Sequence, residues 1–490
     1  MAASTTANDK DKISLKLMVN TEENRVIFAE ADSTLVDTLF SFMTLPLGTI
    51  VRLLEKVSDE KVKTLGSLNN LYHSLVDFPD KYMSSEESKF LMLNPRSSSY
   101  DYCQKLKLNI DDTEPGKYFV CENSDCYRRS GALYSFCCSA KCRYCGKLMN
   151  QQIKFMGSTI RKGSGFVSDE MTFVVTDDLN VFPNTLGLSI RKRCDFGTTD
   201  LSKLEQRSFD IGLEQMLTLL KAAIYCKYPL TYLVFNSSQP IRELFSPEQG
   251  NIIQHLTKNE TAENSKRLTL KVNLQKSTSK FLLAEADEDF ADFIFGFLEI
   301  PLGILIGKLM KGSSSLDSLD NLFASISNMS VEGCIKSQDL KDMLIKPQLA
   351  YKHVSQNQIF PLDVLNNVQL FCHSCYYYPK NKVVPYIKCS DKKDEIDENL
   401  CDNRRCDAIA FKDARAQGRY LKTSAKVMLT DDLVITPLSS ISTVSVLKKL
   451  KVSLNDIEEH NISIGIEEGL KILKASLKSL STFSDALRKI

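Results

Sequence analysis

The chain has 490 residues, of which 43% are hydrophobic and 25% are charged, the composition of an ordinary soluble globular protein. Its 62 basic residues nearly balance 61 acidic residues, so the net charge of +1 provides no overall field that would attract nucleic acid or an anionic membrane. A chain of this length is expected to contain roughly two to four domains.

The first residues of the chain, MAASTTANDKDK, are polar and lack the apolar core of a signal peptide, which argues against secretion. The most apolar run, residues 35–54, approaches the length of a membrane span but contains Asp37, Pro46 and Arg52. We interpret it as a buried, broken helix and expect an intracellular protein, cytoplasmic or nuclear, without membrane attachment. In a reducing compartment most of the 15 cysteines should be thiols or metal ligands rather than disulfides.

One segment of the chain occurs twice. Residues 13–56 align without a gap with residues 268–311, and 14 of the 44 positions are identical, including the sequences AEAD and PLG. Such self-similarity predicts two tandem copies of one unit. We therefore expect a first repeat at 1–235, a polar linker at 236–267 and a second repeat at 268–490.

The start of each repeat has the pattern of a β-hairpin followed by a helix. Apolar and polar residues alternate along 13–19, and β-branched and aromatic residues follow at 25–31. Asp32 or Ser33 can cap the next helix, which Pro46 should break within LPLG. A short helix is expected after Ser67 and after Ser318, and the charged, Ser-rich run at 82–100 is interpreted as a mobile connection.

The end of each repeat is also similar. MTFVVTDDLNVFP from Met171 and AKVMLTDDLVITP from Ala425 each predict a strand that ends in a Thr-Asp-Asp turn. Residues 204–223 and 457–476 share eight of twenty positions and predict a helix with one apolar face, containing Leu213, Met216, Leu217 and Leu220 in the first copy and Ile466, Leu470 and Leu473 in the second. The expected fold class is α+β: in each repeat a β-hairpin and broken helix, a Cys-rich zinc-ribbon-like insert, then a strand and C-terminal helices.

The strongest chemical signal is a set of four cysteines in the first repeat. Two pairs on tight turns, separated by enough chain for a hairpin, can deliver four thiolates tetrahedrally to one zinc ion. The ligands predicted on this basis are Cys121, Cys126, Cys142 and Cys145, with Cys137 or Cys138 as possible replacements. The alternatives are reduced thiols that pack in the core and redox chemistry by the Cys142–Cys145 pair.

The second repeat contains a similar set with the spacing inverted, because the short gap comes first. Its predicted zinc ligands are Cys372, Cys375, Cys401 and Cys406, with Cys389 as a possible replacement. His373, between the first two cysteines, is interpreted as a bystander.

Acidic residues occur at equivalent positions of the two repeats. They are Glu30, Asp32, Asp37, Asp177 and Asp178 in the first and Glu285, Asp287, Asp292, Asp431 and Asp432 in the second. Such carboxylates can hold a hard cation or act as acid and base. The preferred interpretation is structural, with Asp32 and Asp287 as helix caps and the Thr-Asp-Asp sites as Asx-turns, because neither a nearby histidine nor a phosphate loop accompanies them.

Several of these segments together resemble a known family. SLKL, the AEAD segment, LPLG, the paired cysteines, TDDL and SIGIEEGLKILKASL resemble the plant-expanded family catalogued as domain of unknown function 674. The resemblance covers both repeats and nearly the whole chain. It implies a plant-type protein and assigns no catalytic residues, because the family has no established activity.

Three functional hypotheses follow. The first is a non-enzymatic, zinc-stabilised binding or scaffold protein whose partner is another protein. The second is a metal-dependent hydrolase or transferase that uses the duplicated acidic residues, which requires Asp177 and Asp178 to converge with Glu30 or Asp32. The third is zinc-dependent nucleic-acid binding, against which the near-zero net charge argues.

Overall fold

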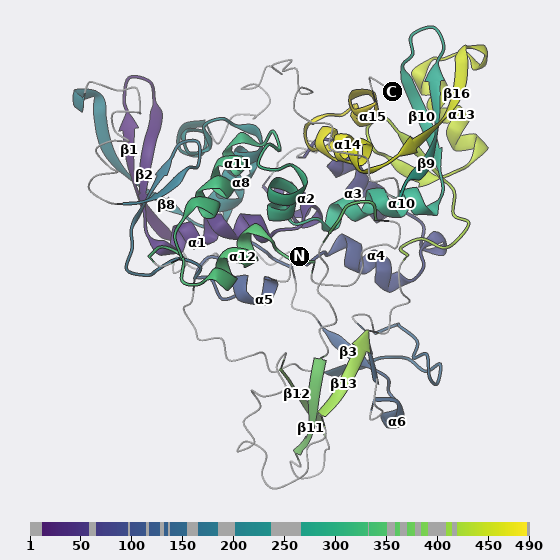
Figure 1. Ribbon diagram of the computed structural model, residues 1–490, viewed down its shortest axis with the longest axis horizontal. Helices are drawn as coiled ribbons and strands as arrows, with labels where there is room; N and C mark the ends of the chain where they lie inside the picture. The colour runs from purple at the N-terminus through teal and green to yellow at the C-terminus, as the bar shows by residue number, and fades with distance from the viewer. Residues whose placement is uncertain are drawn as a thin grey trace, which may run out of the picture.

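The computed structural model has a mixed α+β fold that contains three sheets. Two five-stranded sheets lie at opposite ends of the molecule with helices between them, and a six-stranded sheet lies below (Figure 1). The structure describes residues 12–57, 65–96, 99–113, 117–127, 132–135, 138–153, 165–184, 201–236, 266–331, 333–349, 358–362, 370–377, 384–390, 408–413 and 419–487. Residues up to 236 are called the first half below, and residues from 266 onward the second half.

The sheet of the first half has the strand order β7-β6-β2-β1-β8. Its strands are β1 Ile13–Asn20, β2 Arg25–Ala31, β6 Phe173–Thr176, β7 Val181–Pro183 and β8 Leu204–Ile211. The antiparallel pairing of β1 with β2 confirms the predicted hairpin. The edge strand β8, which pairs with β1 along its whole length, was not predicted.

The sheet of the second half has the order β15-β14-β10-β9-β16, which repeats the order of the first sheet strand by strand. Its strands are β9 Leu268–Gln275, β10 Phe281–Ala286, β14 Val427–Thr430, β15 Ile435–Pro437 and β16 Ile457–Ile464. In both sheets the predicted strand before the Thr-Asp-Asp turn pairs with the second strand of the hairpin.

A broken helix follows each hairpin, as predicted. In the first half it comprises α1 Ser33–Ser41, a 3₁₀ turn Phe42–Thr44 (η2) and α2 Leu47–Lys56. In the second half it comprises α10 Glu288–Phe295, a 3₁₀ turn Gly296–Glu299 (η7) and the π-helical η8 Ile304–Leu309. Proline has no N–H to donate to the preceding turn, so each helix restarts after Pro46 or Pro301.

The helix-breaking sequences LPLG at 45–48 and IPLG at 300–303 face each other across the middle of the molecule. Pro46 and Pro301 form an isolated antiparallel bridge. The N–H of Leu47 donates to the carbonyl of Ile300 at 3.0 Å, and the N–H of Leu302 donates to that of Leu45 at 2.9 Å. The motif that breaks each helix thus also joins the two halves.

The remaining helices lie mainly between the two five-stranded sheets (Figure 1). They are α3 Leu68–Asp77, α4 Glu86–Leu93, α5 Tyr100–Cys103, α8 Leu213–Tyr225 and α9 Pro229–Thr231 in the first half, and α11 Asp317–Asn328, α12 Gln338–Ile345, α13 Ser440–Leu450, α14 Ile466–Lys478 and α15 Thr482–Ala486 in the second. Short helical turns lie at Asp80–Tyr82, Leu201–Lys203, Tyr232–Asn236 and Leu454–Asp456.

Two expectations about helices were wrong. Helix α4 lies within residues 82–100, because Ser85 caps it by accepting the N–H of Ser88 at 3.1 Å and buried Met92 fixes it to the core. Leu213 and Ile466, assigned to an apolar helix face, are 46% and 36% exposed. Both are the first residues of their helices, one turn away from the part that packs on the sheet.

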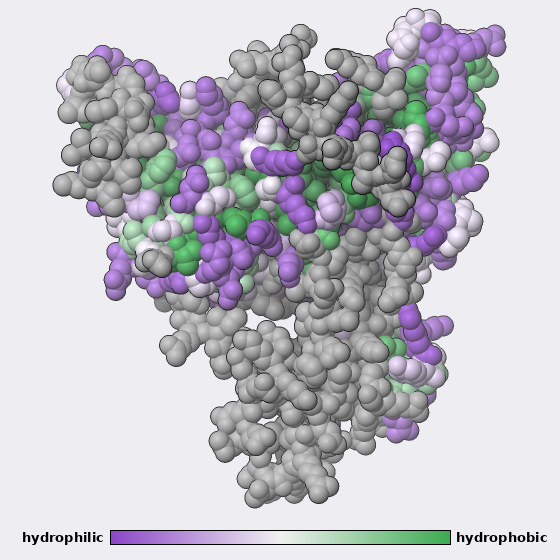
Figure 2. Space-filling view, viewed as in Figure 1, coloured by the Kyte–Doolittle hydropathy of each residue, from purple (hydrophilic) through white to green (hydrophobic). Residues whose placement is uncertain are grey.

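One hydrophobic core runs through both halves, and its largest fully buried side chains include Phe40, Phe42, Phe293 and Phe297. On the face shown in Figure 2, hydrophobic residues reach the surface mainly over the middle of the molecule, interspersed with hydrophilic ones. No described helix has both the length and the apolarity needed to cross a bilayer.

The six-stranded sheet combines strands from both halves in the order β12-β11-β13-β4-β3-β5. The first half contributes β3 Tyr118–Val120, β4 Ala132–Ser135 and β5 Gln151–Ile153, and the second contributes β11 Leu370–Tyr377, β12 Val384–Ser390 and β13 Ala408–Asp413. The halves meet where β13 pairs in parallel with β4. Most of the predicted linker, residues 237–265, lies outside the described residues.

Candidate metal centre

The four cysteines predicted in the first repeat come from three local structures. Cys121 directly follows β3, and Cys126 belongs to the short helix α6 Ser124–Tyr127. Cys142 and Cys145 lie on one tight turn, in which the N–H of Gly146 donates to the carbonyl of Cys142 at 2.8 Å. Gly146 has a φ of +72°, a left-handed conformation that glycine adopts without steric cost.

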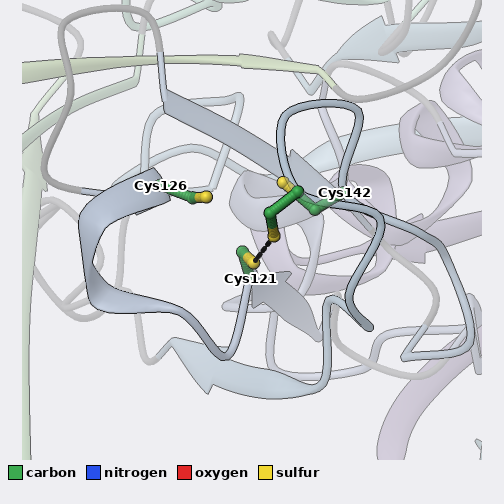
Figure 3. Close-up of side chains that lie close together, drawn as sticks. Cys121, Cys126 and Cys142 are labelled. Atoms are coloured by element: carbon green, nitrogen blue, oxygen red, sulfur yellow. Dashed lines mark hydrogen bonds between the residues drawn. The ribbon is translucent and has the colours of Figure 1, made fainter.

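The four sulfur atoms lie within 4.8 Å of one another. The closest contact recorded is between the Sγ atoms of Cys121 and Cys145, at 3.3 Å, and no disulfide is formed. The side chains of Cys121, Cys126 and Cys142 point toward a common centre from different directions (Figure 3). Cys121, Cys126 and Cys142 are buried and Cys145 is exposed, so the group could hold a metal ion near the protein surface.

The surroundings of the group affect its thiols in different ways. The backbone N–H of Lys147 is the main reason that the pKa of Cys145 falls to about 7. Burial raises the pKa of Cys121 to about 12, although the N–H of Asn123 donates to its sulfur at 3.4 Å. A bound cation would supply the positive charge that deprotonates all four thiols, which links metal binding to the local fold.

The other predicted cysteine positions are described only in part. Cys138 is exposed and outside the group of four, and Cys137 lies outside the described residues. Cys372 pairs with Cys389 through the backbones of β11 and β12, and Cys375 also belongs to β11. Cys401 and Cys406 lie outside the described residues, so the second set of ligands stays a prediction.

Asp32 and Asp287 cap helices, as the structural interpretation of the duplicated acidic residues predicted. Asp32 accepts the N–H of Leu35 and Asp287 accepts that of Phe290, both at 3.0 Å. Glu30 is exposed on β2. These carboxylates are therefore occupied locally or point to solvent.

Asp37 and Asp292 have a structural role that the sequence analysis did not foresee. Asp37 accepts the backbone N–H groups of Phe166 and Val167 at 2.6 and 2.9 Å. Asp292 accepts those of Tyr420 and Leu421 at 3.1 and 3.0 Å. Burial raises the pKa of each carboxyl to about 7, against the opposing effect of the two N–H donors.

The interpretation of the Thr-Asp-Asp sites as local Asx-turns was wrong for the first aspartate of each pair. Asp177 accepts the backbone N–H and the hydroxyl of Thr231 at 2.8 and 2.6 Å, and Asp431 does the same with Ser484 at 2.8 and 2.6 Å. The chemistry of an aspartate at a turn gave no signal of a partner more than 50 residues away.

The aspartates do not converge with Glu30 or Asp32 in the way that the hydrolase hypothesis requires. Each buried one binds a different part of the backbone, as described above. Across the described ranges, the four cysteines are the one group of three or more Cys, His, Asp or Glu side chains placed to share a metal ion.

Comparison with protein-family models matches residues 9–467 to the family described as "Protein of unknown function (DUF674)". This match confirms the resemblance found in the sequence motifs. Neither the search of curated proteins nor the search of solved structures gave a match.

Proposed function

The chain belongs to the family described as "Protein of unknown function (DUF674)", and from this premise we propose a zinc-stabilised binding or scaffold protein built from two copies of one unit. The observation that carries the proposal is the gathering of four thiols within 4.8 Å without a disulfide. No catalytic role is assigned to any residue.

The donor set favours zinc as the resident metal. Four thiolates in a tetrahedral arrangement suit zinc or iron, and hard cations such as Mg²⁺ and Ca²⁺ prefer oxygen ligands. With Zn–S bonds of about 2.3 Å, a tetrahedral site places its sulfur atoms about 3.8 Å apart. The separations of up to 4.8 Å would need only a small contraction, and Cys121, Cys126, Cys142 and Cys145 would be the ligands.

The small core around the cysteines supports a structural role for this metal. Among the residues that the structure describes, Met149, Leu133 and Ala140 are those that pack with the buried cysteines. So few apolar side chains contribute little hydrophobic stabilisation, and metal binding can supply the remainder. We infer a zinc-ribbon-like insert whose folding depends on the ion.

The duplication hypothesis draws support from both sequence and architecture. Fourteen identities in 44 positions accompany two sheets of the same strand order. We propose that the chain arose as two tandem copies, a first repeat at 1–235 and a second at 268–490, joined by the linker at 236–267.

Metal analysis of the purified full-length chain tests the zinc site. We expect a colourless protein that loses one equivalent of zinc in the variant Cys142→Ser/Cys145→Ser. Cys138→Ser is the matched control, because Cys138 is free and exposed, lies four residues before Cys142 in the chain and is outside the group, and this variant should keep its zinc. Iron in place of zinc, or an unchanged zinc content in the double variant, would contradict the proposal.

For the binding role, helix α13 offers a surface on which a protein partner can be sought. Ile441 and Val444 lie one turn apart and are 80% and 58% exposed, and Leu454, ten residues after Val444 in the chain, is 72% exposed. We expect proximity labelling with the wild-type chain to enrich proteins that the variant Ile441→Ser/Val444→Ser does not enrich. Identical labelled sets would argue against this surface.

A further inference from the structure

Helix α3 of the first half is bonded to the sheet of the second half. The side-chain amide of Asn70 donates to the backbone carbonyl of Asp432 at 2.7 Å and to its carboxylate at 3.0 Å. The hydroxyl of Ser74 accepts the N–H of Ile435 on β15 at 2.9 Å. The first half thus satisfies polar groups at the end of a strand of the other half.

The reverse contact exists with the same chemistry. On helix α11 of the second half, the amide of Asn321 donates to the carbonyl and the carboxylate of Asp178 at 3.0 and 3.3 Å. Ser325 accepts the N–H of Val181 on β7 at 3.0 Å. The equivalent Asn and Ser residues therefore bind equivalent positions of the opposite sheets, which is the pattern of an isologous dimer interface.

The N-terminal ends of these helices are also hydrogen-bonded to the opposite half. The hydroxyl of Ser67 donates to the carbonyl of Ser479 at 2.6 Å, and that of Ser318 donates to the carbonyl of Cys226 at 3.0 Å. Ser67 and Ser318 are both buried, so each depends on the opposite half for its partner.

Two short backbone contacts, called seams below, also join the halves through β-bridges. In one, Met83 forms a β-bridge with Leu421. The N–H of Ser84 donates to the carbonyl of Tyr420 at 2.7 Å, and the N–H of Lys422 donates to the carbonyl of Tyr82 at 2.9 Å. In the other, Val167 bridges Ile335, again with one bond in each direction at 2.9 and 3.0 Å. Asp292 and Asp37 accept N–H groups of residues in these bridged segments, so each buried carboxylate holds a segment of its own half that pairs with the other half.

We infer that the chain is a covalently linked, intertwined dimer in which each half is the obligate partner of the other. The alternative is two independently folded domains that dock. Docked domains would each cover their own sheet with their own helices. Here each five-stranded sheet is built from the strands of one half but is hydrogen-bonded to a helix of the other half, and the six-stranded sheet takes strands from both. The surface formed by α3 and by the Thr-Asp-Asp turn therefore fits a second copy of the same unit, which this chain supplies in tandem.

Cleavage of the folded chain tests this inference. A protease site is inserted between Gln249 and Gly250, in residues that join the halves, and the full-length protein is purified before it is cut. We expect the two fragments to elute together at the position of the intact chain in native buffer, to separate in urea, and to unfold in a single transition. Two fragments that separate in native buffer and each unfold cooperatively would overturn the inference.

Amide hydrogen exchange in two matched variants tests, without cutting the chain, whether each helix is bonded to the opposite half. In Asn70→Ala we expect amide hydrogens at residues 430–435 of the second half to exchange about tenfold faster, because roughly one hydrogen bond is lost there. The exchange rates at residues 176–181 should not change. Asn321→Ala is the matched variant, in which exchange should become faster at residues 176–181 and stay unchanged at residues 430–435. Faster exchange confined to the half that carries the substitution would contradict the exchanged arrangement.

Discussion

Replacement of Asp292 by asparagine should flatten the dependence of stability on pH. The carboxylate accepts the N–H groups of Tyr420 and Leu421 with its two oxygens, and burial raises its pKa from 3.8 to about 7. Asp289, which also raises this pKa, and Arg419, which lowers it, are the charged neighbours that contribute most. Asparagine has nearly the same shape but does not ionise in this range.

The sign follows from proton linkage. Because the pKa of Asp292 is higher in the folded state, the folded protein binds the proton more tightly than the unfolded chain does. The contribution of Asp292 to the free energy of unfolding is therefore greatest below about pH 4, falls as the pH rises toward 7, and changes little above that. A shift from 3.8 to about 7 corresponds to about 4 kcal/mol at about 1.4 kcal/mol per pH unit.

Asparagine has a separate cost that does not depend on pH. Its side-chain oxygen can accept only one of the two N–H groups, because its amide nitrogen is a donor, and an unsatisfied buried N–H costs about 1–3 kcal/mol. At pH 4.5 the variant should therefore be less stable than the wild type. By pH 8 the difference should shrink or reverse, because the wild type alone has lost the contribution of the bound proton.

Urea denaturation at half-unit intervals between pH 4.5 and 8 measures this effect. Asp37→Asn should behave in the same way, because the carboxyl of Asp37 has an equivalent environment with Lys336 and Asp169 as its charged neighbours. Asp210→Asn is the control, since Asp210 is exposed on β8. If Asp292→Asn and the wild type lost stability in parallel across this pH range, the reasoning would be refuted.

Two further substitutions test the packing between the halves and the helix caps. Gly303→Ala would place a Cβ atom 2.5 Å from the carbonyl oxygen of Leu344 and 3.0 Å from that of Met43, so calorimetry should show a loss of about 1–3 kcal/mol, whereas Gly333→Ala, with its nearest neighbour at 3.5 Å, should be close to neutral. Asp287→Ala removes the cap of α10 and should cost about 1 kcal/mol in urea denaturation, and an unchanged midpoint would show that the bond to Phe290 contributes nothing.

The local elements were predictable because their signals are local. Alternation along 13–19 identified β1, and Asp32 together with Pro46 set the start and the break of the helix. The four cysteines were predictable for the same reason, since spacing on tight turns limits where the sulfur atoms can lie. In each case the residues that decide the structure lie no more than 24 positions apart in the chain.

The bonding of each helix to the sheet of the opposite half was not predictable, because the sequence does not say whether a helix packs on its own half or on the other. The same Asn and Ser residues could have bonded to the sheet of their own half, and the sequence of α3 does not distinguish these outcomes. The edge strand β8 was missed because most of its side chains are exposed, so its sequence lacks the apolar alternation of a half-buried strand. The partner of Asp177 was missed because Thr231 lies 54 residues away in the chain, and the residues around the turn do not indicate it.

The position of the cysteine group would give a bound metal ion a role beyond the first half. Strand β13 of the second half meets the first half through a short parallel pairing, in which Phe411, Lys412 and Asp413 lie opposite residues 132–134 of β4. Strand β4 is held on its other side by β3, which leads directly into Cys121, and Leu133 of β4 packs against the buried cysteines. So short a pairing depends on β4 being fixed in place. If a metal ion holds the cysteines, it also holds the strand on which the three strands of the other half are assembled.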